Sequence, residues 1–487
     1  MAKRKLSTFE RLTKGPLNRK QRKELCRRLY SDNPGLEIIH PNTAGIDVGN
    51  ESHFVAVAPG CDPQPVREFG SWTAALHQIA DWLQSLAIQH VVMQSTGVYW
   101  VALYEVLEKR GFKVCLANAR DTRNLPGRKT DVQESQWLLK LHTYGLLRNS
   151  FRPPEQIRVL RTVWRLRDRH VADAGREIQH MQKALTKMNV QLANVISDIS
   201  GITGQAIVRA ILKGQRDPYK LAEMKDYRIR ASKEEIARSL EGNWQEDVLF
   251  ELQQAVDRYD FCHQQIAGCD RKLQQYLAAL PSRSIASAQP AERADEPETG
   301  KKKKRRNRQK ANGKPRKNQP AFDLQAELAR ICGVNLASLP GVSVMTIQTW
   351  VSELGVDMTP WPTEDHLVSW LKLSPRPRIT GGKVIRQEKI KVKNRVAEAL
   401  RMAATTLINS DSYLGACYRY LRARKEPAKA IKAMAAYLAK LFYRMLTKGK
   451  AWVDRGNQEH QRRRAERELH ALERRAAARG LRLVPAA

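Results

Sequence analysis

The stretch that decides the fold is TAGIDVGNESHFVAVA, residues 43–58. Residues 43–49 form a short apolar run interrupted by Asp47, residues 50–52 are turn formers, and residues 53–58 have the composition of a second strand. This pattern predicts a β-hairpin whose first strand carries an aspartate inside an otherwise buried segment. Because a buried carboxylate is costly unless it is paired or bound to a cation, Asp47 is a candidate functional residue.

Strands and helices alternate after this hairpin. A third strand near Val66–Phe69 would complete a meander. The later elements are expected as a helix at Thr73–Leu86, a strand at His90–Gln94, a helix at Trp100–Arg110, a strand at Lys113–Leu116 and a long helix from Asp131. A meander followed by alternating helices and strands predicts an α/β domain with a mixed sheet.

The charge of the chain is strongly one-sided. Lys and Arg number 85 against 50 Asp and Glu, which gives a formal net charge of +35. Such an excess favours a polyphosphate partner, because phosphate neutralisation releases counterions and steers association. The alternative is a ribosomal-type or merely basic protein. The sequence has no apolar run of about 18 residues and no apolar stretch at its N-terminus, so we expect neither a membrane span nor a signal peptide.

Cysteine and histidine do not point to a structural metal. The seven cysteines are widely scattered without a C-x-x-C pair, and the eleven histidines do not cluster along the sequence at metal-ligand spacing. We therefore expect no zinc site. Scattered cysteines of odd number are typical of reduced thiols in a cytoplasm.

Composition divides the rest of the chain. Apolar residues recur at three- and four-residue steps between about 155 and 280, and Leu240, Val248, Leu252 and Val256 form one such stripe, which favours a helical hairpin or coiled-coil arm that dimerises. Residues 301–317 hold eleven Lys or Arg, which is typical of a disordered linker. We expect this linker to bind nucleic acid; the alternative is a solvated tether. The expected parts are a basic arm with one short helix at 1–40, the α/β domain at 41–152, the helical arm at 153–281, the linker at 282–322, a mainly α domain at 323–455, and a basic helix and tail at 456–487.

Two further acids open the helix that starts near residue 131. Asp131 and Glu134 are three residues apart and so share a helix face. Together with Asp47 they would make a Mg²⁺ site of the oxygen ligands that phosphodiester chemistry uses. The alternative is that Asp131 is an N-terminal helix charge and Glu134 a capping-box partner. A hairpin with a central aspartate and a late helical acid pair is the layout of RNase H-like nucleases, which favours the metal site.

The end of the fourth strand lacks the acid that such a site would include. Gln94 stands there, at the start of QSTGVYW (residues 94–100). Its amide offers a neutral carbonyl oxygen but no charge. The alternative is a glutamine that simply caps the strand end.

Two C-terminal motifs are candidates for holding phosphate. The segment LPGVSV, residues 339–344, resembles a helix-hairpin-helix turn whose backbone N–H groups hold DNA phosphate; the alternative is an ordinary Pro-Gly turn. The segment SPRPRITGGK, residues 374–383, reads as an open loop that lets phosphate approach the backbone. The basic residues that follow it would stabilise a pentacovalent transition state, unless this is only a basic loop with a local hydroxyl turn.

These features, in this order, resemble the DEDD–serine transposases of the insertion sequence 110 family, specifically its 1111 branch. The resemblance runs from about Ala44 to Val453. Its motifs are Gly45-Ile-Asp-Val-Gly49, Gln94-Ser-Thr-Gly-Val-Tyr-Trp100, Leu125-Pro-Gly-Arg-Lys-Thr-Asp-Val-Gln-Glu-Ser-Gln-Trp137, Leu141-His-Thr-Tyr-Gly-Leu-Leu147, Ser369-Trp-Leu, Thr380-Gly-Gly-Lys383 and Ala397–Ala404.

The resemblance implies a DNA recombinase guided by a structured non-coding RNA. It implies a RuvC-like N-terminal metal domain, a C-terminal transposase domain with a nucleophilic serine, and a bridge RNA that pairs with donor and target DNA. It further implies a composite active site in homodimers that assemble into a tetramer on DNA. A covalent protein–DNA phosphoester would keep the bond energy for rejoining. The implied location is the nucleoid of a prokaryotic cytoplasm.

Carried over residue by residue, the resemblance places Asp47 at the first family acid and Asp131 at the third. Gln94 stands where the second acid, a glutamate, is expected, and Glu134 where the fourth is usually an aspartate. Thr380 occupies the position of the serine, where its extra methyl crowds the hydroxyl. The candidate nucleic-acid-binding residues are Arg128, Lys129, Gly341, Ser343, Gly381, Gly382, Lys383, Arg386, Lys391, Lys393 and Arg395.

The leading hypothesis is therefore an RNA-guided transposase that uses Mg²⁺ and Thr380, with Ser374 as the next candidate nucleophile. The alternative is a catalytically weakened, repurposed RNA-guided DNA-binding protein that acts as a regulator, motivated by Gln94 and Thr380. A junction-resolving nuclease without RNA is less favoured. Helical tyrosines, namely Tyr418, Tyr420 and Tyr443, are expected to pack and not to act as nucleophiles.

Overall fold

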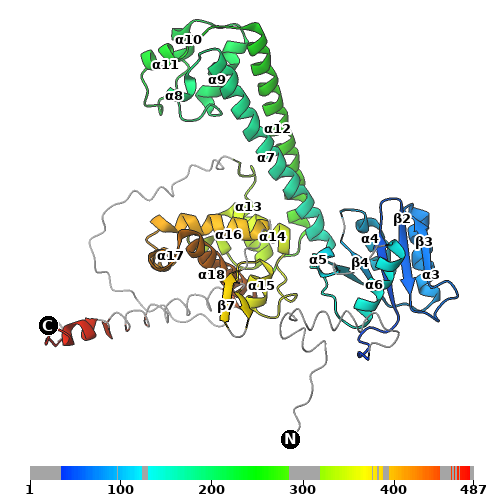
Figure 1. Ribbon diagram of the computed structural model, residues 1–487. Coiled ribbons are helices and arrows are strands. Elements are labelled where there is room, and N and C mark those ends of the chain that lie inside the picture. The colour runs from blue at the N-terminus through cyan, green and yellow to red at the C-terminus, as the bar shows by residue number, and fades with distance from the viewer. Residues whose placement is uncertain are drawn as a thin grey trace. The chain divides into compact units, whose positions relative to one another are not determined.

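A mixed five-stranded sheet organises the first of the two compact units of the chain, which divide between Arg152 and Pro153 (Figure 1). The protein is seen in a computed structural model that describes residues 35–95, 97–122, 130–283, 318–375, 377–380, 383–387, 394–449, 462, 466, 469–470 and 472–482. The predicted short helix of the basic arm falls in residues 1–34, which lie outside the described part of the chain, as does most of the predicted linker.

The sheet has the strand order β3-β2-β1-β4-β5. β1 pairs antiparallel with β2 and parallel with β4, so the meander and the parallel part share β1 at the centre. The predicted ends of the strands and helices agree with the observed ones within one residue. The elements are β1 (Thr43–Val48), β2 (Ser52–Val57), β3 (Val66–Gly70), α3 (Thr73–Ser85), β4 (His90–Gln94), α4 (Trp100–Lys109), β5 (Lys113–Ala117), α5 (Ala119–Thr122) and α6 (Asp131–Thr143).

Helices cover both faces of this sheet. Ala44, Ile46 and Val48 point into a core that includes the apolar faces of α3 and α4. Because side chains alternate along a strand, Gly45 and Asp47 point to the other face, where α6 packs. The order of strands and the helices on both faces are consistent with an RNase H-like domain.

A long helical hairpin opens the second unit, and Figure 1 shows its two helices side by side. α7 (Glu155–Lys187) and α12 (Glu246–Ala279) are joined across their interface by Arg167, whose buried guanidinium pairs with Asp270. The coiled-coil character of this arm and its dimerisation stay predictions. Four short helices lie between the two long ones, namely α8 (Leu192–Val195), α9 (Ile202–Leu212), α10 (Pro218–Ala222) and α11 (Lys233–Ser239).

The predicted stripe that joined Leu240 to Val248 on one helix is wrong. Leu240 caps the C-terminal end of α11, and α12 begins only at Glu246. The turn between them is held against the end of α7, because the N–H of Asn243 donates to the carbonyl of Met188 at 2.7 Å. Leu240 is nevertheless buried in the same core as the other members of the stripe.

The C-terminal part is mainly helical, as predicted, but it also contains a two-stranded ribbon. Its elements are α13 (Leu324–Cys332), η1 (Leu336–Ser338), α14 (Val344–Leu354), α15 (Glu364–Trp370), β6 (Pro377–Thr380), β7 (Lys383–Gln387), α16 (Arg395–Thr406), η2 (Leu407–Asn409), α17 (Tyr413–Arg424) and α18 (Pro427–Lys448). Within the described residues, no helix combines the length and the apolar composition that a membrane crossing needs.

The ribbon corrects the prediction of an open loop at residues 374–383. β6 and β7 pair antiparallel, with Thr380 opposite Lys383. β-Branched residues such as Ile379 and Val384 favour strands, and a Gly-Gly dipeptide between two such runs is a signal for a two-residue hairpin. Those two glycines, 381 and 382, lie outside the described residues.

Candidate functional site

The direction of α6 brings its acidic first turn to the carboxyl edge of the sheet. The carbonyl of Thr143, the last residue of α6, accepts from the N–H groups of Ile39 and His40, which precede β1. Further along β1, a Cβ placed on Gly45 would lie 2.4 Å from the carbonyl oxygen of Ser135. α6 therefore runs antiparallel to β1, and its first turn lies beside the end of β1 that carries Asp47.

Asp47 lies where two parallel strands end. The last residue pair in the register of β1 and β4 is Ile46 with Met93, and the next residues along the two strands are Asp47 and Gln94. Asp47 is half-buried between the buried side chains of Ile46 and Val48. The predicted placement of an acid in an otherwise buried strand is therefore observed.

Gln94 is joined to the short helix α5. Its Oε1 accepts a hydrogen bond from the Thr122 hydroxyl at 3.2 Å. The backbone carbonyl of Thr122 in turn accepts from the indole N–H of Trp137 on α6, at 3.3 Å. The strand end, α5 and α6 are thus linked by hydrogen bonds around the edge that holds Asp47.

The first turn of α6 is capped by Thr130 and not by an acid. The Thr130 hydroxyl oxygen accepts from the N–H of Gln133, the third residue of the helix. Glu134 lies one position further on, so the alternative that it is the capping-box partner is wrong. Asp131 is exposed and Glu134 is half-buried, and both carboxylates suit the positive end of the helix dipole.

The oxygen donors at this edge suit Mg²⁺ by their chemistry. They do not form a preformed ligand set, because no group of three or more His, Cys, Asp or Glu among the described residues is arranged to hold a metal ion. Asp47, Asp131 and Glu134 belong to elements that share an edge, and their role as metal ligands stays a prediction.

Three histidines meet at the opposite end of α6. His142 stacks on His40 with 4.6 Å between ring centroids, and His90 lies 4.8 Å from His40. Neither ring nitrogen of the buried His142 has a hydrogen-bond partner among the described residues. Burial, followed by the positive charge that His40 and His90 can carry, lowers the pKa of His142 to about 3. Burial, and charge including that of Lys113, also lowers the pKa of His40 and of His90.

We expect this histidine trio to make the first unit acid-sensitive. The folded pKa of His142 lies below its unfolded value, so its contribution to stability is complete above about pH 6.5 and is lost as the pH falls toward 3. The free energy of unfolding should drop by up to about 1.4 kcal/mol per pH unit for this one group. Urea unfolding of the full chain, followed from neutral to acidic pH, measures it. His142→Leu should flatten the pH dependence, whereas His77→Leu, on an exposed position of α3, should not; equal slopes would contradict the expectation.

The Pro-Gly turn before α14 packs against Leu407 and leads into the residue that caps the helix. Gly341 has φ +79°, and a Cβ there would lie 2.7 Å from the Leu407 side chain. The Ser343 hydroxyl oxygen accepts from the N–H of Thr346 and caps α14. Contact of Gly341 and Ser343 with phosphate, and the helix-hairpin-helix assignment, stay predictions.

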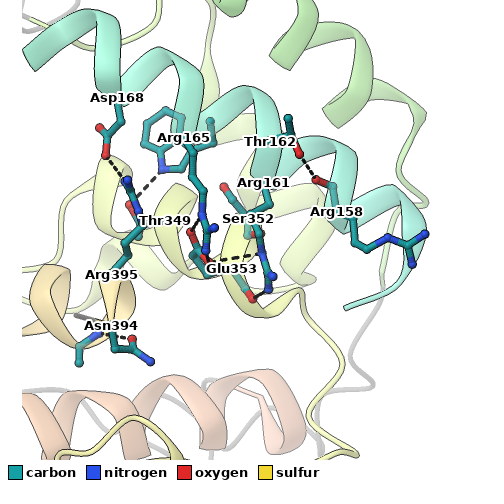
Figure 2. Close-up of polar contacts among 12 residues, drawn as sticks. Arg158, Arg161, Thr162, Arg165, Asp168, Thr349, Ser352, Glu353, Asn394 and Arg395 are labelled. Atoms are coloured by element: carbon teal, nitrogen blue, oxygen red, sulfur yellow. Dashed lines mark hydrogen bonds and ion pairs between the residues drawn. The ribbon is translucent and has the colours of Figure 1, made fainter. Parts of the chain in front are cut away.

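The candidate nucleophile and the nucleic-acid-binding candidates are only partly described. Thr380 ends β6. The described part of the chain does not include the side chains of Thr380, Lys383 and Arg386, nor residues Arg128, Lys129, Gly381, Gly382, Lys391 and Lys393. Arg395, the first residue of α16, is described, and its guanidinium pairs with Asp168 of α7 at 2.6 Å (Figure 2).

Burial and contacts describe the surroundings of the alternative nucleophiles. Tyr418 is buried, and the hydroxyl of Tyr443 donates to the carbonyl of Trp361 at 3.0 Å, as expected for packing residues. The expectation was wrong for Tyr420, which is 53% exposed with the Arg424 guanidinium over its ring. The carbonyl of Ser374 accepts from the Lys432 ammonium at 3.3 Å.

The mixed sheet with Asp47 at its carboxyl edge is consistent with an RNase H-like domain. Two family models match the chain. DEDD_Tnp_IS110, described as Transposase, matches residues 44–190, and Transposase_20, described as Transposase IS116/IS110/IS902 family, matches residues 333–419. These matches support the IS110 family and a DNA transposase or recombinase. Comparison with curated proteins found no match.

Proposed function

We propose that the protein cuts and rejoins DNA strands through a covalent hydroxyl–phosphodiester intermediate, guided by a bridge-type RNA that pairs with donor and target DNA. The observation that carries the proposal is the shared edge of Asp47 and the acidic first turn of α6, inside the segment that matches a transposase family. The net charge of +35 supports a large nucleic-acid partner.

The acids would act on the phosphate. Asp47, Asp131 and Glu134 are proposed to hold Mg²⁺, which would neutralise charge on the reacting phosphodiester. Gln94 lies beside Asp47 at the strand ends, where its hydrogen bond with Thr122 fixes the amide. It would orient the site through a neutral oxygen.

Thr380 is proposed as the nucleophile. Its hydroxyl loses a proton and forms an oxygen–phosphorus bond, while the bond from phosphorus to a deoxyribose oxygen breaks and that oxygen takes up a proton. A deoxyribose hydroxyl then attacks the phosphothreonine, which rejoins the DNA and restores Thr380 without an external energy source. The basic residues from Lys383 to Arg395, together with Arg128 and Lys129, would hold phosphates. The proposed assembly is a homodimer that forms a tetramer on DNA, in the nucleoid of a prokaryotic cytoplasm.

Thr380→Ala should abolish the covalent adduct with nicked DNA, because the attacking oxygen is removed. Thr380→Ser should keep or raise adduct formation, since it removes only the crowding methyl. In the measurement, the full-length protein is incubated with its native RNA and labelled nicked DNA, and the products are separated by denaturing electrophoresis. Ser374→Ala is the matched control and should form normal adduct. An adduct that survives Thr380→Ala and disappears in Ser374→Ala would transfer the role to Ser374.

A second candidate is a cleavage-silent RNA-guided DNA-binding regulator. It is favoured by Gln94, whose amide is engaged with Thr122 where an acidic ligand would be expected. Incubation of the protein and its co-purified RNA with donor and target plasmids separates the two functions. Recombined plasmid excludes the regulator; RNA-dependent DNA binding without adduct or recombinant supports it.

A further inference from the structure

One face of α7 carries a line of basic residues. At 3.6 residues per turn, these positions lie within about 20° of one line parallel to the helix axis, and they extend over about 43 Å. We call this line the α7 stripe, and its members are Arg158, Arg165, Arg169, Arg176, Lys183 and Lys187.

The stripe faces away from the hairpin interface. The buried positions of α7, such as Leu160, Trp164 and Leu185, lie on the opposite side of the helix. The acids of α7 lie about 60° or more from the centre line of the stripe on a helical projection. The line itself therefore carries only cations, with Asp173 at its border.

Acidic neighbours engage part of the stripe. Arg165 pairs with Glu353 at 2.6 Å, and Lys187 pairs with Glu251 at 2.7 Å. Arg176 pairs with Asp173, an acid of α7 itself. Arg169 and Lys183 are exposed, and no ion pair or hydrogen bond is recorded for their side chains within the described residues. These two cations are therefore available to another molecule.

The first half of the stripe adjoins Arg395. Arg395 pairs with Asp168, the residue before Arg169, and Figure 2 shows this contact beside the one between Arg165 and Glu353. Both contacts lie inside the second unit. Arg395 is thus held beside the first half of the α7 stripe.

We propose that the α7 stripe is a docking surface for the phosphate backbone of duplex DNA, with Arg395 beside it. The inference rests on the proposed function and adds the path of the DNA that lies outside the reacting site. The stripe is longer than one turn of B-form DNA, which is about 34 Å, and consecutive cations stand about 6 to 11 Å apart along the axis. Point charges on flexible stems at such spacing bind phosphates of any sequence.

The experiment compares two double variants that lose the same charge. Arg169→Gln/Lys183→Gln removes the two available cations of the stripe, and Arg271→Gln/Lys272→Gln removes two exposed cations of α12. Fluorescence anisotropy of the full chain with a random-sequence DNA duplex, over a range of salt concentrations, gives the slope of log Kd against log salt. The stripe variant should reduce this slope by about 1.8, which is about 0.9 per lost phosphate contact. The α12 variant should leave it unchanged.

Two further arms make the result decisive. Arg169→Lys/Lys183→Arg keeps the charges and should restore the slope, and thermal unfolding establishes that each variant is folded. Equal slopes for both Gln variants, or a loss seen only with an RNA duplex, overturn the docking surface. Because adduct formation through Thr380 is measured separately, wild-type adduct with unchanged DNA slopes sinks only this inference, whereas absent adduct in the wild-type chain sinks the proposed function.

Discussion

Replacing Asp47 with asparagine should reduce DNA strand cleavage by about a thousandfold, equivalent to about 4 kcal/mol of transition-state stabilisation. The reason is the loss of the one carboxylate that β1 contributes to the carboxyl edge of the sheet. The rate of covalent adduct formation on nicked DNA measures the effect.

Stability should change little. Asparagine keeps the size and shape of the half-buried Asp47 side chain, so the protein should stay folded. Asp81→Asn is the matched control, because Asp81 is an exposed acid of α3, which covers the other face of the sheet. It should cleave normally. Normal cleavage by Asp47→Asn, or a loss of activity that merely follows a loss of folding, would contradict a functional role for this carboxylate.

Gly45→Ala should be the most damaging small substitution in the first unit. A Cβ there would lie 2.4 Å from both the N of Leu139 and the carbonyl oxygen of Ser135. These are backbone atoms of α6 and cannot rotate away, so the helix must move. We expect a loss of about 3 kcal/mol in the free energy of unfolding, together with loss of cleavage, because the same shift displaces Asp131 and Glu134.

Urea unfolding of the full chain checks this expectation. Gly175→Ala is the control, since a Cβ on that helical glycine of α7 would have no neighbour within 4 Å. It should be neutral or stabilising by up to about 1 kcal/mol. A Gly45→Ala chain with wild-type stability and activity would mean that the close approach of α6 does not position the acids.

Much of the site was predictable because its signals are local. The alternation of β1 and β2, the turn formers between them and the acid inside an apolar run are all read within residues 43–58. Gln94 falls at a strand end for the same reason. Gly45 was missed as a contact residue, although a glycine inside a strand pattern is a recognised sign of close backbone approach.

Two predictions in the second unit were wrong because hydrophobic periodicity does not show which elements pair or pack together. A basic run with two glycines reads as a loop until its flanking β-branched residues pair, as β6 and β7 do. The stripe through Leu240 failed because a buried apolar residue can belong to a neighbouring helix of the same core. Local spacing predicts which face of a helix or strand is buried, but it does not predict which other element packs against that face.

The sequence by itself determined the α/β character of the first unit, the acid in its central strand and the strong net positive charge of the chain, because these depend on residue type and short-range spacing. The tertiary structure alone decided which distant residues meet. It set the antiparallel course of α6 that brings its acids toward Asp47, the meeting of His40, His90 and His142, and the ion pair of Arg395 with Asp168. Such contacts depend on how whole elements pack, and packing sums many weak interactions that no local pattern contains.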